Sequence, residues 1–225
     1  MKILALETTE RIGSVAISEQ GNLLVEVRLP DDLRSAQSLA PAIQQTLEQV
    51  GWTAQDVELV AVTSGPGSFT GLRIGIATAK MFAYAVGAEV LGVDAHETLA
   101  LACPANVSKL AAVIDAQRGQ VVARNFERNG SGELVPCSES ELLDVDDWLK
   151  SLSPGTRVTG PILRRLADRL PESVEPLDPE VWTPTAARVA QLADRQYSAG
   201  RRGDLWKLAP VYSRPSAAEE KRRRK

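Results

Sequence analysis

Apolar runs bounded by turn residues open the chain, and such runs predict strands. They lie at Lys2–Glu7, Ser14–Ser18, Leu23–Leu29, Val57–Thr63 and Glu89–Val93. Apolar residues recur at helical spacing elsewhere, and this spacing predicts helices. The helical stretches are Leu39 to Val50, Ile76 to Val86 and Ala95 to Cys103. Three hairpin-joined strands followed by helix-linked strands predict a mixed sheet with helices packed on it.

The same order of elements restarts after Cys103, so we expect two domains, residues 1–103 and 104–225. Strands are expected at Leu110–Asp115, Gln120–Glu127, Glu133–Cys137 and Arg157–Gly160, and helices at Asp144–Leu152, Pro161–Leu170 and Thr183–Ala199. This order predicts an α/β fold made of two mixed-sheet units. It resembles the duplicated ribonuclease-H-like architecture of actin and sugar kinases, in which nucleotide binds between the halves.

Composition narrows the class of protein. Hydrophobic residues make up 44% and charged residues 24% of the 225 residues, which is typical of a soluble globular protein. The net charge of −3 gives no overall basic field for nucleic acid. Two cysteines indicate a reducing compartment, and no apolar run approaches the length of a membrane span or a signal peptide. We expect a cytoplasmic protein that does not bind membranes.

The glycine-rich stretch Gly65-Pro66-Gly67-Ser68-Phe69-Thr70-Gly71-Leu72-Arg73-Ile74-Gly75 links an expected strand to an expected helix. Backbone amides at such a junction can bind an anion. The stretch lacks the Lys-Ser or Lys-Thr pair of a P-loop and the spacing of the dinucleotide fingerprint. The alternative is a tight corner between a strand and a helix.

The helix that follows is apolar nearly all round, with Leu72, Ile76, Ala79, Ala83 and Val86 in one stripe. Such a helix is buried on more than one side. Either it is sandwiched within one domain, or one face meets another chain. We expect self-association through this helix and the one starting near Ser38. The expected interface comprises Leu39, Ile43, Ser68, Phe69, Thr70, Leu72, Arg73, Ile76, Ala79, Lys80 and Ala83.

Two acidic residues end matching strands of the two halves, Glu7 beside Thr8 and Thr9, and Asp115. A pair of acids across a cleft could hold a metal–nucleotide. The alternatives are a solvated strand end for Glu7 and a turn for Asp115, bonded to turn amides or to Arg118. His96, the single histidine, is expected on the surface of a helix's opening turn, and Trp148, Trp182 and Trp206 are expected to serve packing.

Several stretches resemble the TsaB family, also called YeaZ, of bacterial tRNA threonylcarbamoyladenosine synthesis. They are Ile3-Leu4-Ala5-Leu6-Glu7-Thr8-Thr9 with Ser14-Val15-Ala16, the glycine-rich stretch, Ile114-Asp115-Ala116-Gln117-Arg118-Gly119-Gln120-Val121, and Pro210-Val211-Tyr212-Ser213-Arg214. Their order and spacing cover nearly the whole chain.

The resemblance implies a non-catalytic partner of the transferase TsaD, which acts with the ATPase TsaE on the adenosine beside the tRNA anticodon. It suggests that TsaD uses the surface expected for self-association through the helices starting near Ser38 and Thr70, so the homodimer of the isolated chain and the working heterodimer would exclude each other. ATP or ADP would be a ligand of the complex, and none is expected to bind the isolated chain tightly. The basic tail Lys221–Lys225 is either a solvated end or a contact for tRNA phosphates.

Two other functions stay open at this stage. A sugar-kinase-type phosphotransferase would need a base and a phosphate loop in each half. A glycoprotease-like metallopeptidase would need about three metal ligands, and one histidine with two distant cysteines gives no histidine-rich site. We therefore expect no metal site.

Overall fold

The computed structural model describes residues 1–31 and 35–214, so the tail at 221–225 lies outside the described residues. The first of its two mixed sheets holds the strands β1 (Lys2–Glu7), β2 (Ser14–Glu19), β3 (Asn22–Arg28), β4 (Leu59–Gly65) and β5 (Glu89–Asp94), in the order β3-β2-β1-β4-β5. The helices that follow β3 and β4 in the sequence are α1 (Ser35–Gln49) and α2 (Phe69–Val86). Strands β2 and β3 run antiparallel, while β4 and β5 are parallel to β1.

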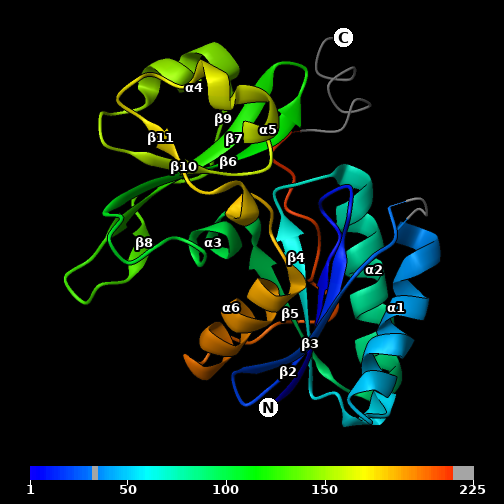
Figure 1. Cartoon of the computed structure of the whole chain (residues 1–225). Coiled ribbons are helices and arrows are strands. Elements are labelled where there is room, and N and C mark those ends of the chain that lie inside the picture. The colour runs from blue at the N-terminus through cyan, green and yellow to red at the C-terminus, as the bar shows by residue number, and fades with distance from the viewer. Residues whose placement is uncertain (32–34, 215–225) are drawn as a thin grey trace.

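The second sheet repeats this plan. Its strands are β6 (Lys109–Gln117), β7 (Gln120–Arg128), β8 (Leu134–Pro136), β9 (Glu141–Asp144), β10 (Arg157–Thr159) and β11 (Glu175–Pro176), ordered β11-β10-β6-β7-β8 with β9 also on β7. The remaining helices are α3 (Ala95–Ala100), α4 (Val145–Ser151), α5 (Leu163–Leu166) and α6 (Ala186–Ser198). The expected duplicated ribonuclease-H-like architecture is confirmed, with two short strands, β9 and β11, that the sequence did not predict (Figure 1).

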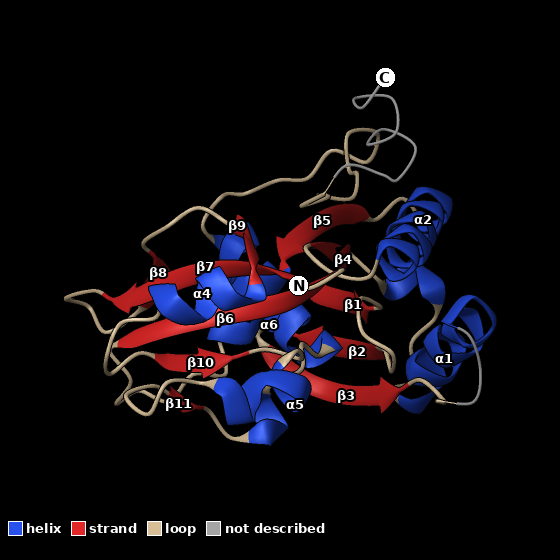
Figure 2. Cartoon of the chain, turned by 90° about the horizontal axis from the view of Figure 1, so that it is seen from above, coloured by secondary structure: helices blue, strands red, loops and turns tan. Residues whose placement is uncertain are grey.

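Strand β1 lies at the centre of the first sheet and is buried on both faces. Leu4 and Leu6 contact the core under α1 and α2, whereas Ile3 and Ala5 contact the core under α6. Successive side chains of a strand point to opposite faces, so one apolar run supplies both cores. Figure 2 shows α1 and α2 together on the side away from the second sheet.

Helix α6 follows the second sheet in sequence but packs on the first. It contacts all five strands of that sheet, and Ala186 N donates to Ser14 Oγ. The helix is capped by Thr185, whose hydroxyl accepts from Arg188 N, rather than by the expected Thr183. The division at residue 103 stays a prediction, but α6 belongs to the core of the first sheet. Within residues 1–31 and 35–214, no helix combines the length and apolarity that crossing a bilayer requires.

Helix α2 begins at Phe69. This is earlier than the helical stretch Ile76 to Val86 but agrees with a helix starting near Thr70, as the interface prediction had it. Ser68 caps the helix by accepting from Gly71 N. A Cβ atom on Gly71 would lie 1.9 Å from the carbonyl oxygen of Thr8, and one on Gly75 would lie 2.3 Å from Thr8 Oγ1. Both glycines therefore allow the helix to approach the first turn closely, rather than making a turn themselves.

The chain's own core buries the stripe of α2 that we expected to face a partner. Leu72, Ile76, Ala79 and Ala83 are at most 4% exposed, and Leu39 and Ile43 of α1 are at most 5% exposed. These six residues are thus corrected to internal packing residues. The uncovered side of α2 carries Ile74, which is half-buried, and Met81, which is 69% exposed.

We expect Ala83→Arg to lower the free energy of unfolding by more than about 3 kcal/mol, because it forces a charge into a packed core. Ala85→Arg, two residues along on the exposed side of the same helix, is the matched control and should change stability by less than about 0.5 kcal/mol. Urea unfolding measures both. Equal stabilities would show that α2 can turn the Ala83 side outward.

Candidate functional site: the cleft between the sheets and the exposed side of α2

Glu7 ends strand β1 and is fully buried, so the expected solvated strand end is wrong. One carboxylate oxygen accepts from Thr9 N and from Thr9 Oγ1, each at 2.5 Å, and the other accepts from the Thr63 hydroxyl. Burial raises the pKa of Glu7, while these hydrogen bonds act in the opposite direction. Both oxygens are thus engaged by the protein itself.

The first turn, Thr8–Thr9, is held against the glycine-rich stretch. The Thr8 hydroxyl donates to Gly71 O at 2.8 Å, and Ser68 N donates to Thr9 O at 3.2 Å. A Cβ atom on Gly67 would lie 2.5 Å from Thr9 Cβ. The glycine-rich stretch therefore packs onto the first turn, which favours the tight corner over an anion site.

A cavity of about 430 Å³ lies between the two sheets and is lined by both halves of the chain. Thr9 and Asp115, two of the four residues expected at a nucleotide site, line it, whereas Glu7 and Thr8 are buried and absent from its lining. Asp115 accepts from Gln117 N and pairs with Arg165 at 2.5 Å. The expected bond to a turn amide is confirmed, and the ion pair with Arg165 was not foreseen.

Glu10 lines the same cavity and had no role in the sequence prediction. Its carboxylate lies 3.7 Å from Arg164 of the other half, so this pair crosses the cleft. Burial first, and then the charge of Glu7, raise the pKa of Glu10 to about 7. Its charge therefore changes near neutral pH.

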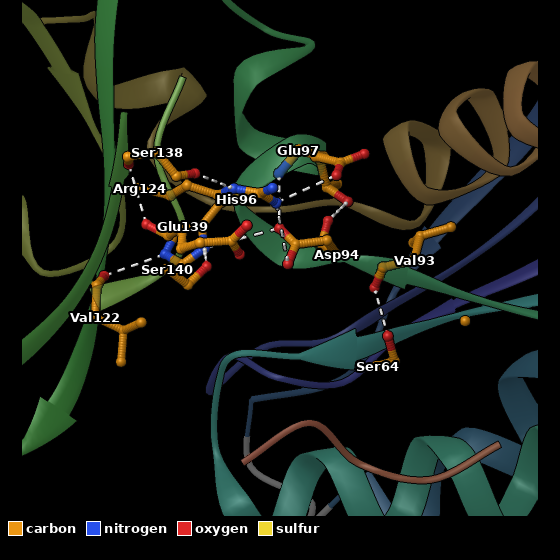
Figure 3. Close-up of polar contacts among 12 residues, drawn as sticks. Ser64, Val93, Asp94, His96, Glu97, Val122, Arg124, Ser138, Glu139 and Ser140 are labelled. Atoms are coloured by element: carbon orange, nitrogen blue, oxygen red, sulfur yellow. Dashed lines mark hydrogen bonds and ion pairs between the residues drawn. The ribbon is translucent and has the colours of Figure 1, made fainter. Parts of the chain in front are cut away.

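A polar network at helix α3 also joins the two sheets (Figure 3). His96 is fully buried, which corrects the expected surface position. Its Nε2 lies 3.1 Å from the Val122 carbonyl, and its Nδ1 lies 3.3 Å from the Ser140 hydroxyl. Because a carbonyl only accepts, Nε2 carries the proton, and Nδ1 accepts from Ser140. Burial lowers the pKa of His96 and favours the neutral ring.

Arg124 of β7 completes this network. Its guanidinium lies 3.3 Å from the Glu97 carboxylate and 3.8 Å from the Asp94 carboxylate, both on the first half of the chain. Glu97 also accepts from Gln196 of α6. The two sheets are thus tied by partly buried charges and by a neutral buried histidine.

The C-terminal segment, residues 201–214, runs beside α2 and was not recognised as part of any site. Lys80 Nζ donates to the carbonyls of Trp206 and Leu208, and Arg73 Nε donates to the Tyr212 hydroxyl at 2.9 Å. Trp206 is 76% exposed, so its expected packing role is wrong, whereas Trp148 and Trp182 are buried as expected. The family-like stretch Pro210–Arg214 was the sequence signal for this segment.

Among the described residues, no group of three or more histidine, cysteine, aspartate or glutamate side chains is arranged to hold a metal ion. Cys103 and Cys137 are free thiols.

Comparison with known proteins decides the family. Residues 33–173 match the family model described as TsaD, tRNA N6-adenosine threonylcarbamoyltransferase. The chain is 29% identical to the tRNA threonylcarbamoyladenosine biosynthesis protein TsaB of Escherichia coli, over 98% of both chains. It is also 29% identical to TsaB of Bacillus subtilis, over 70% of this chain and 68% of the relative. The structure of YeaZ from Pseudomonas aeruginosa superposes with a TM-score of 0.80 at 25% identity, over 94% of this chain and 99% of that one.

The chain belongs to the TsaB (YeaZ) family. The pieces on which the resemblance depended lie together in this TsaB-family structure. The first turn packs on the glycine-rich stretch, and Tyr212 of the C-terminal stretch stacks on Phe69 with ring centroids 4.8 Å apart. The turn at Gln117 closes the same cleft.

The free energy of unfolding should depend on the charge of Glu10, and we expect Glu10→Gln to abolish the decrease in this free energy that ionisation of Glu10 causes as pH rises. The pKa of Glu10 is about 7 in the folded chain and 4.5 in the unfolded one, so folding binds a proton between these values. Wild-type stability then falls from about pH 4.5 to 7, and the variant should gain about 1 to 3 kcal/mol on wild type between pH 4.5 and pH 8.

Urea unfolding across this pH range measures the effect. Glu141→Gln, on the exposed strand β9, is the control variant. An equal difference between Glu10→Gln and wild type at both ends of the range would contradict the assignment.

Proposed function

We propose that this TsaB-family chain is a non-catalytic partner of a TsaD-type transferase in the formation of threonylcarbamoyladenosine in tRNA. The names of the Escherichia coli and Bacillus subtilis relatives support the pathway. The family model that residues 33–173 match is named for the transferase, so this chain is itself similar to the partner that we propose. TsaE, a cytoplasmic location and a nucleotide in the complex belong to the same proposal.

The state of Glu7 supports the non-catalytic part. A carboxylate that holds magnesium through water must be open to solvent. Glu7 is fully buried, and its oxygens accept hydrogen bonds from Thr9 and Thr63. The glycine-rich stretch packs directly on the first turn, since Ser68 N donates to Thr9 O and a Cβ atom on Gly67 would lie 2.5 Å from Thr9 Cβ.

The other two functions lose support from the same geometry. A kinase needs a base beside its acceptor hydroxyl, and Asp115 is engaged by Arg165. A metallopeptidase needs a set of metal ligands, and His96 is buried with a carbonyl and a hydroxyl as its neighbours.

The partner surface that we propose is the uncovered side of α2 together with α1. Between these helices lies an apolar hollow of about 550 Å³, lined by residues that include Ala40, Trp52, Met81 and Phe82. Open apolar surface of this kind marks protein contacts on soluble chains. We infer that a second copy of the chain covers it in the isolated protein, burying roughly 1,200–2,000 Å² in total, and that TsaD replaces this copy in the working complex.

Complementation tests the function. The gene should restore threonylcarbamoyladenosine in bacteria depleted of their own TsaB, and the purified chain should bind the TsaD of its own organism. The proposed function is rejected if the gene does not restore threonylcarbamoyladenosine and the chain does not bind TsaD.

We expect Met81→Arg to yield a folded monomer that no longer binds TsaD, because it places a charge on the apolar side of α2. Analytical ultracentrifugation gives the oligomeric state, and a pull-down with TsaD gives partner binding. Leu23→Arg, at a 52% exposed position on the edge strand β3, is the matched control and should do neither. A variant that stays dimeric and still binds TsaD would show that the interface lies elsewhere.

We expect no micromolar binding of magnesium-ATP to the isolated chain, since the side-chain oxygens of Glu7 and Thr8 already form hydrogen bonds within the protein. Calorimetric titration measures this. A dissociation constant in the micromolar range would bring back the phosphotransferase hypothesis.

A further inference from the structure

Four exposed aromatic residues lie along the junction of α2 and the C-terminal segment. They are Phe69 (41% exposed), Tyr84 (69%), Trp206 (76%) and Tyr212 (41%). Together with the basic residues Arg73, Lys80 and Lys207 they form a surface that we call the aromatic–basic strip. Arg73, Lys80 and Tyr84 share one face of helix α2. Arg73 contacts Tyr212, and Lys80 and Tyr84 contact Trp206. The strip therefore lies on the side of α2 opposite to α1.

The charge of this region is opposite to that of the chain as a whole. Residues 69–86 contain two basic and no acidic residues, and residues 201–214 contain four basic residues and Asp204. The two stretches together have a formal charge of +5, whereas the whole chain has −3. Arg201 and Arg202 contact α6, and Arg214 contacts Gln120 of the second half, so these three charges lie outside the strip. The strip itself carries three basic residues and borders one acidic residue, Asp204.

The two cations of α2 are held by neutral oxygens. Arg73 donates to a hydroxyl and Lys80 to two backbone carbonyls. In the described part of the chain neither has an ion pair, unlike Arg124 and Arg165, which face carboxylates. Their charges are thus positioned but not offset. Lys207 pairs with Asp204 at 3.5 Å and is 86% exposed.

The aromatic rings are held in place by contacts within the strip. Phe69 and Tyr212 are stacked, and the Arg73 guanidinium lies 3.8 Å from the centre of the Phe69 ring. Tyr84 and Trp206 meet edge to face with ring centroids 5.9 Å apart. Large exposed rings that are already ordered lose little conformational entropy when a flat ligand stacks on them.

We propose that the aromatic–basic strip binds the RNA substrate, with its cations on phosphates and Trp206 against an unstacked base. RNA offers both a dense row of negative charge and exposed base faces, and single-stranded loops are read by stacking on aromatic rings. This inference rests on the proposed function, which supplies tRNA as the ligand class. An acidic protein surface is the competing occupant, and the experiment below separates the two.

The test uses the full chain, alone and mixed with its cognate TsaD, and a fluorescein-labelled tRNA transcript with an adenosine beside the anticodon. Fluorescence anisotropy at several KCl concentrations gives the affinity and its salt dependence. Lys80→Gln/Lys207→Gln should weaken binding roughly threefold to tenfold and reduce the slope of log affinity against log salt by about 1 to 2. Trp206→Ala should weaken it roughly fivefold or more with the slope unchanged.

The control is Lys109→Gln/Lys150→Gln, which removes two exposed lysines of the second half that lie beside carboxylates. It should leave the affinity within about twofold. Urea unfolding and the TsaD pull-down are repeated for each variant. RNA binding that is lost in the strip variants, with folding and TsaD binding retained, supports the inference.

Several results would overturn it. The first is wild-type protein that binds no tRNA, either alone or mixed with TsaD. The second is strip variants that bind tRNA like wild type, or that lose TsaD binding but keep tRNA binding. The third is tRNA binding that is lost only when residues 215–225 are deleted. If the wild-type gene complements and binds TsaD while the strip variants bind tRNA normally, this inference fails and the proposed function stands. If the wild-type chain neither complements nor binds TsaD, the proposed function fails instead.

Discussion

The close contact between the first turn and the start of α2 sets the rest of the structure. A helix approaches a turn this closely only where side chains are absent, and Gly71 and Gly75 provide two successive gaps on one side of α2. The Thr8 hydroxyl occupies this space and donates to Gly71 O. Glu7 is buried beneath, where Thr9 and Thr63 replace water as hydrogen-bond donors. The acidic end of strand β1 thereby becomes part of the packing.

The two sheets are held together at several places that are distant in sequence. The network of His96 and Arg124 joins them beside α3, and α6 returns from the second half to cover the first sheet. The C-terminal segment adds a further tie, since Val211 N donates to Ser64 O and Arg214 contacts the carbonyl of Ala116. Contacts therefore cross between the two halves at three separate places.

The sequence predicted the elements well where one local pattern decides them. The strands of the first sheet and the helical spacing of Leu39, Ile43 and Leu47 were read correctly. It failed where a residue's role depends on what packs against it. Gly71 and Gly75 lie inside helix α2, and no local pattern indicates that Thr8 occupies the space beside them. Helical periodicity also identified the apolar stripe of α2, but it could not decide whether the stripe packs on the sheet of the same chain or on another chain.

Polar residues were the least predictable, for the same reason. Glu7 and His96 look like surface residues in sequence, and both are fully buried because distant donors and acceptors satisfy them. Trp206 looks like a packing residue in sequence, yet its side chain is 76% exposed, and its backbone carbonyl accepts from Lys80. The pairings of Glu7 with Thr63, His96 with Val122 and Lys80 with Trp206 join residues 56, 26 and 126 positions apart, and no local pattern encodes them.

Helix α2 has three chemically distinct sides. Ala79 and Ala83 face the sheet, and their small size lets the helix lie close to it. Met81 and Phe82 border the apolar hollow against α1, and Arg73 and Lys80 border the C-terminal segment. A protein partner that covers the apolar side leaves the basic side open, because the two lie on opposite flanks of the same helix. The helix that is apolar nearly all round in sequence is thus divided in the structure into a core side, an apolar contact side and a charged side.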